Sequence, residues 1–84
     1  MSFGYKAKTN DVRVAIRDAA STSGTVVTRI SNGSDIEVGT SIIKDSTANT
    51  WRKVAYGYKN IGYMMTNFIS IKSRTSNKYY MIEA

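Results

Sequence analysis

Short apolar runs alternate with polar residues along this 84-residue chain, mostly with a period of two. In the segment 12–17, Val12, Val14 and Ile16 share one face, which is the pattern of a half-buried strand. Turn dipeptides such as Asn-Gly separate the runs at short, regular intervals. This spacing is typical of an all-β sandwich or barrel, and no long helical period is present.

The pattern predicts one all-β domain over residues 1–84. Strands are expected at residues 2–8, 12–17, 25–30, 34–38, 51–54 and 62–64. The segment 39–50 is the least regular and allows a short strand extension at Ile42-Ile43. A single 3₁₀ turn is expected from Thr66-Asn67, with Phe68 and Ile69 closing the core.

One aromatic-rich stretch, WRKVAYGYKNIGYMMTNFI at residues 51–69, predicts a hairpin with its turn at 57–60. It holds the only Trp and three of the six Tyr, and rings with a polar tip suit contacts with peptides and sugars. Tyr58, beside the turn, is expected to be exposed, whereas Trp51 and Tyr63 could equally be half-buried core residues. The candidate ligand-binding residues are Trp51, Arg52, Tyr56, Tyr58, Lys59, Asn60, Tyr63 and Asn67.

The net charge of +6 and the pI near 9.8 favour anionic partners, such as nucleic acid, acidic membrane or phosphate-rich wall polymers. The basic residues are scattered, so an ordinary solvated surface explains the charge equally well. A patch of Arg52, Lys53, Tyr58 and Lys59 would suit single-stranded nucleic acid, but no signature motif accompanies it. Nucleic acid is therefore the least favoured of these partners.

Catalysis has little chemical support, because the chain contains neither His nor Cys. Asp35 and Glu37 share one strand face and could form an acid–base pair or a weak cation site, although a solvated edge explains them better. We expect no enzyme activity, no cofactor and no metal. The absence of Cys also excludes disulfides and thiolate zinc sites.

Five segments in register resemble bacterial SH3-like (SH3b) domains. They are VAIR at 14–17 with the Ser/Thr-rich loop after it, ISNGSDIEV at 30–38, WRKV at 51–54, GYM at 62–64 and TNFI at 66–69. The resemblance covers residues 12–69 and departs from the family pattern at Ala19-Ala20, where the family carries Gly-Pro. It implies a small SH3-like barrel of five to seven short antiparallel strands with one 3₁₀ turn. Residues 70–84 would add a C-terminal strand or a hairpin about 75–77, with Ile71 facing Tyr80 and Ile82.

The resemblance also implies a function, because such domains occur in peptidoglycan hydrolases and phage endolysins as wall-targeting modules. It implies a non-catalytic module that binds cell-wall peptide or an anionic wall polymer. The alternative is a small assembly protein of a phage or phage-like particle that contacts other subunits, or a second copy of itself, through a C-terminal strand. Candidate residues for that role are Tyr79, Tyr80 and Ile82.

The N-terminal sequence MSFGYKAKTND has no apolar h-region, so a signal peptide is not predicted. No apolar run is long enough to predict a membrane span. We expect the protein to act in the cytoplasm, to reach the wall after lysis or within a longer secreted chain, or to sit in a phage particle.

Overall fold

Eight short strands and one 3₁₀ turn make up the part of the chain that the structure, a computed structural model, describes: residues 3–57 and 60–74. They are β1 (Tyr5–Thr9), β2 (Val14–Arg17), β3 (Val26–Ile30), β4 (Asp35–Val38), β5 (Ile43–Lys44), β6 (Thr50–Tyr56), β7 (Asn60–Met65), the turn η1 (Thr66–Phe68) and β8 (Ile69–Arg74). Every pairing is antiparallel. The prediction of an all-β antiparallel fold with one short 3₁₀ turn is confirmed.

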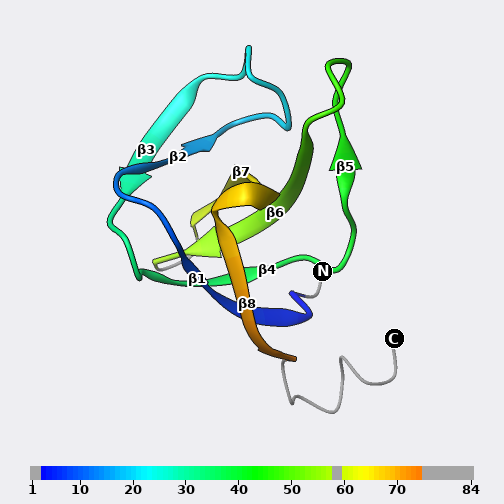
Figure 1. The fold of residues 1–84 in the computed structure, drawn as a ribbon. Coiled ribbons are helices and arrows are strands. Elements are labelled where there is room, and N and C mark those ends of the chain that lie inside the picture. Colours follow the sequence, from blue (N-terminus) through cyan, green and yellow to red (C-terminus); the bar gives the residue numbers. More distant parts are fainter. Residues whose placement is uncertain (1–2, 58–59, 75–84) are drawn as a thin grey trace.

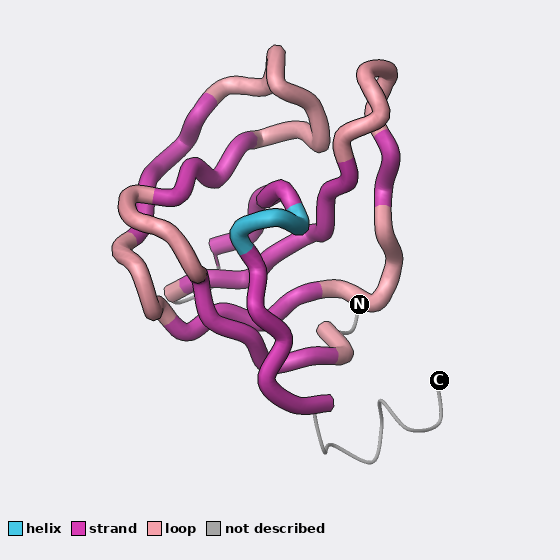
Figure 2. Tube along the Cα trace, viewed as in Figure 1, coloured by secondary structure: helices cyan, strands magenta, loops and turns pink. Residues whose placement is uncertain are grey.

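The strands form one curved sheet in the order β3-β2-β7-β6-β4-β1-β8, and β5 pairs with the first part of β6. Figure 1 shows this sheet curving round on itself, and Figure 2 shows the short helical turn η1 between β7 and β8. In the described part of the chain, the strands at the two ends of this order, β3 and β8, do not pair with each other, so the expected barrel is open rather than closed. The sheet also splays where β2 meets β7, because one pair, Arg17 and Tyr63, joins them.

The core lies on the concave side of the sheet and follows the predicted alternation. Ile36 and Val38 point inward from β4, while Asp35 and Glu37 point outward. The buried apolar cluster consists of Ala7, Val14, Ile16, Ile36, Val38, Val54 and Met64. Burial of each large side chain in this cluster contributes roughly 1.5–3 kcal/mol. Phe68 and Ile69 pack against the cluster, as the sequence predicts.

The prediction for Val12 is wrong. We expected this residue on the inner face of a strand beginning at residue 12, but β2 begins at Val14 and the Val12 side chain is 71% exposed. The reason is a turn, in which the Asp11 carboxylate accepts a hydrogen bond from the Val12 N–H at 2.7 Å. Arg13 then adopts a left-handed backbone with φ of 49°. Val12 therefore lies in a turn, and the alternation of buried and exposed side chains begins only at Val14.

The expected extra C-terminal strand is present as β8. It pairs with β1 from Tyr5 opposite Arg74 to Thr9 opposite Ile69, with a bulge between Lys6 and Ala7. The chain therefore brings its first and last described strands side by side (Figure 1). The proposed hairpin about 75–77 lies outside the described residues.

A search of the described residues for a helix long and apolar enough to span a bilayer finds none.

Candidate binding groove

The β6–β7 hairpin presents two of its side chains, Lys53 and Tyr63, on the convex side of the sheet. They lie directly opposite each other in the ladder, and the Lys53 Nζ lies 6.0 Å from the centre of the Tyr63 ring. This distance fits a cation–π contact. The preceding residue, Gly62, explains the placement, because a Cβ there would lie 2.4 Å from Cγ2 of Ile16. Glycine lets β7 sit against the core while Tyr63 faces the other way.

Lys53 and Tyr63 form one side of a groove of about 280 Å³. Its lining is mixed in character: two aromatic rings, one aliphatic side chain, one cation and a short loop of small residues. The lining residues are Phe3, Gly39, Thr40, Ser41, Ile43, Lys53 and Tyr63. We call this the Tyr63 groove. Ligand sites usually combine apolar walls with a few polar groups, and the Tyr63 groove contains both.

Two glycines bring separate segments together at the Tyr63 groove. Gly39 is held to β6 by its N–H, which donates to the Lys53 carbonyl at 2.8 Å, and by its carbonyl, which accepts from Nη1 of Arg52 at 2.7 Å. Gly4 lies against Thr40, the residue after Gly39, since a Cβ at Gly4 would be 2.3 Å from Cγ2 of Thr40. The absent Cβ at Gly4 lets the N-terminal segment approach closely enough for Phe3 to line the groove.

The β5 wall of the groove is fixed by the loop that joins β5 to β6. The Asp45 carboxylate accepts hydrogen bonds from Nε1 of Trp51 at 2.8 Å and from the N–H groups of Thr47 and Asn49, each at 2.9 Å. These bonds, the Trp51 bond foremost, lower the pKa of the Asp45 carboxyl from 3.8 to about 2. Because Ile43 is the cross-strand partner of Trp51, the hydrogen bonds of Asp45 also help to position Ile43 in the groove.

Of the predicted ligand-binding residues, Tyr63 lines the groove and the other described ones do not. Trp51 is 1% exposed, so its ring offers no surface to a ligand, and we remove it from the candidate site. Trp51 is buried because β5 and Asp45 cover the N-terminal end of β6. Tyr56 packs against the core, and Arg52 faces the concave side with Val54.

Asn60 and Asn67 are exposed, at the start of β7 and in η1 respectively, and neither lines the groove. The remaining candidates, Tyr58 and Lys59 in the hairpin turn and Tyr79, Tyr80 and Ile82 in the tail, lie outside the described residues.

Sequence reasoning missed most of the groove. Phe3 and Ile43 are far from the hairpin in sequence, and the small residues 39–41 belong to the least regular segment of the sequence. The sequence pattern assigns Lys53 to a candidate nucleic-acid patch instead. One signal was available, because alternation along β6 sets Lys53 and Arg52 on opposite faces.

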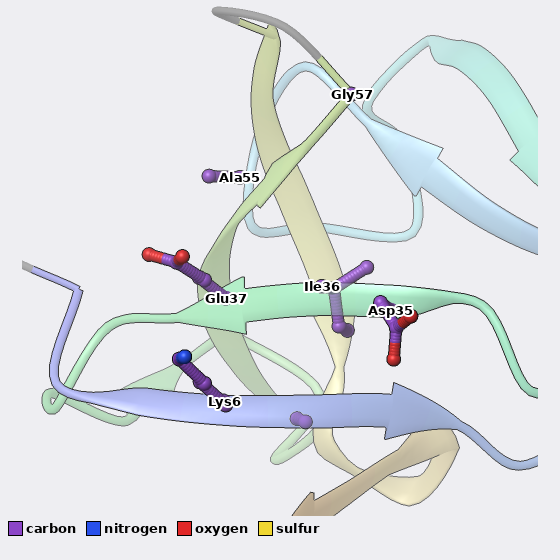
Figure 3. Close-up of a pocket in the computed structure, with 7 residues that line it drawn as sticks. Lys6, Asp35, Ile36, Glu37, Ala55 and Gly57 are labelled. Carbon is purple, nitrogen blue, oxygen red and sulfur yellow. The ribbon is translucent and has the colours of Figure 1, made fainter. Parts of the chain in front are cut away.

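A second, larger hollow of about 610 Å³ lies on the outer side of β1, β4 and β6. Figure 3 shows Lys6 and Glu37 on adjacent strands there, with Asp35 further along β4. Asp35 is 87% exposed at its side chain and forms a salt bridge with Lys8. The hollow is open and its charged side chains face solvent, so it is a weaker candidate than the Tyr63 groove. Within the described residues, no three acidic, His or Cys side chains gather as a metal site would require.

Comparison of the chain with protein-family models, curated proteins and solved structures finds no match. The fold and the groove define an all-β protein with a small aromatic-lined groove on its convex face. The SH3b resemblance stays a prediction.

Proposed function

We propose that the chain is a non-catalytic binding module whose Tyr63 groove takes a short segment of bacterial cell-wall peptide. The observation that carries this proposal is the lining of the groove, where the rings of Phe3 and Tyr63 and the side chain of Ile43 surround one cation, Lys53. Apolar ligand groups would pack on the rings, and a ligand carboxylate would lie near the ammonium.

The loop 39–41 supports a peptide ligand in particular. Thr40 and Ser41 are exposed and carry hydroxyl groups that both donate and accept hydrogen bonds. A peptide has backbone donors and acceptors that need partners when they leave water. The net charge of +6 would assist encounter with an anionic wall, as a long-range and salt-sensitive effect.

Co-sedimentation with purified Gram-positive sacculi, at low and at moderate salt, tests the proposal. Ile43→Ser in the groove is matched by Val27→Ser on β3, since both side chains are exposed and apolar, at 37% and 49%. We expect Tyr63→Ala and Ile43→Ser to weaken binding about tenfold, as for a contact worth over 1 kcal/mol. Val27→Ser should bind like the parent protein.

Two results would contradict this function. One is binding that disappears at moderate salt, since it would report the net charge alone. The other is an equal loss in the Ile43 and Val27 variants, since that would place the contact outside the groove.

A role as an assembly subunit is the second candidate, and one observation favours it. β8 is an outer strand of the described sheet, and its Ile71 is 44% exposed. An outer strand with exposed apolar residues can pair with another chain. Sedimentation velocity tests this role: a defined oligomer that Ile71→Lys dissociates would support it, and a monomer at all concentrations would oppose it.

A further inference from the structure

Two arginine side chains from different strands face the same tyrosine ring. The Cζ atom of Arg52, on β6, lies 5.4 Å from the centre of the Tyr5 ring, and the Cζ atom of Arg74, on β8, lies 5.8 Å from it. Both distances fit cation–π contacts. Tyr5 lies on β1, opposite Arg74 in the β1–β8 ladder. We call these three residues the Tyr5 cluster.

Four of the five described carboxylates are engaged elsewhere. Asp11 and Asp18 accept from nearby backbone N–H groups, Asp35 pairs with Lys8, and Asp45 holds Trp51. Glu37 points outward beside Lys6 (Figure 3). In the described part of the chain, no acidic side chain therefore forms an ion pair with either arginine of the cluster.

One of the two guanidinium groups is already held in place. Nη1 of Arg52 donates to the Gly39 carbonyl at 2.7 Å, and the Arg52 residue is half-buried. This bond uses one of the five N–H donors of the group. The Tyr5 ring gives both cations a common neighbour but no negative charge. Two like charges at one ring repel each other, and an anion between or beside them would relieve that repulsion.

We propose that the Tyr5 cluster is a binding site for a phosphate-class oxyanion of at least two negative charges. Guanidinium groups are planar and delocalised, and their paired N–H donors match the oxygens of phosphate. Contact with an aromatic ring leaves the edges of a guanidinium group open for such bonds. Arg52 faces the concave side of β6 and Lys53 the convex side, so the site lies on the other face from the Tyr63 groove, although Arg52 bonds the groove residue Gly39. The proposal does not rest on the proposed function.

Titration with pyrophosphate at constant ionic strength tests the site. Binding is measured by calorimetry and by NMR of the arginine Nε–H signals. The variants are Arg52→Gln and Arg74→Gln, and the matched control is Lys72→Gln, which removes one positive charge from the same strand as Arg74. We expect saturable binding that weakens about tenfold in each arginine variant, as for loss of a charge-assisted hydrogen bond, and by less than twofold in the control. Succinate at the same concentration should bind more weakly than pyrophosphate.

Three results would overturn the proposal: no saturable binding, an equal loss in all three variants, or equal affinity for succinate. Arg52→Gln also removes the bond to Gly39 and can lower stability. Arg74 is exposed, so its variant keeps the fold and decides the outcome if the Arg52 variant unfolds.

Discussion

The indole N–H of Trp51 donates a 2.8 Å hydrogen bond to Oδ2 of Asp45, joining the N-terminal end of β6 to the loop that follows β5. The other carboxylate oxygen of Asp45 accepts from the backbone N–H groups of Thr47 and Asn49. One side chain thus shapes the loop and ties it to the largest fully buried side chain among the described residues. The β5 wall of the Tyr63 groove depends on this connection.

Trp51→Phe should test the connection most directly. Phenylalanine keeps an aromatic ring but has no N–H, so the Asp45 oxygen loses its donor and the smaller ring leaves space. We expect the free energy of unfolding to fall by about 1.5–3 kcal/mol. Urea denaturation followed by circular dichroism measures it, with Tyr63→Phe as a control at a half-buried position on the opposite strand. A loss in the control as large as in Trp51→Phe would contradict the assigned role of the indole bond.

Acid should weaken the same connection. The Asp45 carboxyl has a folded-state pKa of about 2, below its ordinary value of 3.8, chiefly because of the Trp51 bond. A lowered pKa means that its stabilising contribution is complete above the unfolded-state value and is lost as the pH falls from about 4 towards about 2. Thermal unfolding between pH 5 and pH 2, followed by the fluorescence of the single Trp, should show this decline.

Asp45→Asn provides the control for the acid experiment. It removes the titrating group, so the variant should be less stable at pH 6 and its stability should depend less on pH over the same range. A variant whose melting temperature falls with acid as steeply as that of the parent would assign the decline to other carboxylates.

Gly62→Ala should destabilise the core. The added Cβ would lie 2.4 Å from Cγ2 of Ile16 and 3.0 Å from the Arg17 carbonyl oxygen, so β2 and β7 would have to move apart. We expect a cost of about 1–3 kcal/mol. Gly39→Ala is the matched control, because its Cβ would meet atoms at 3.7 and 3.8 Å, which are ordinary contact distances. Chemical denaturation of both variants gives the comparison, and equal stability of the two would refute the close contact.

Ending the chain after Ile69 should abolish cooperative unfolding. This cut corresponds to the end of the region that resembles SH3b domains, and it removes most of β8, the partner of β1. β1 would then lose one of its two neighbours and expose the core beneath Ala7. Calorimetry of the truncated and full-length chains tests this, with Lys72→Gln as a full-length control. A sharp transition in the truncated chain would show that β8 is dispensable.

The sequence predicted strands at 12–17 and 34–38, and the structure has them as β2 at 14–17 and β4 at 35–38, because a period of two reports directly which face is buried. It did not settle whether Trp51 is exposed. Periodicity shows that Trp51 and Lys53 share a face of β6, but not that the β5 loop covers one and leaves the other beside a groove. That information lies in contacts between segments.

The groove itself was beyond sequence reasoning for the same reason. Phe3 reaches it because Gly4 packs on Thr40, a contact between segments with no common pattern. Val12 shows the opposite failure, in which an apolar residue in perfect alternation is displaced by a turn that one carboxylate stabilises. Periodicity assigns faces within a strand, whereas turns and loops decide where the strand begins and what covers it.

The pairing of β1 with β8 has a consequence for synthesis of the protein. β1 leaves the ribosome before the other described strands, yet one of its neighbours is complete only when Arg74 has emerged. Until then β1 lacks its β8 neighbour and can pair only with β4. Pairings between residues so distant in sequence also form slowly, because a long loop must close first. We therefore expect folding to finish only after β8 has been synthesised, with the earlier strands open to chaperones and to mispairing until then.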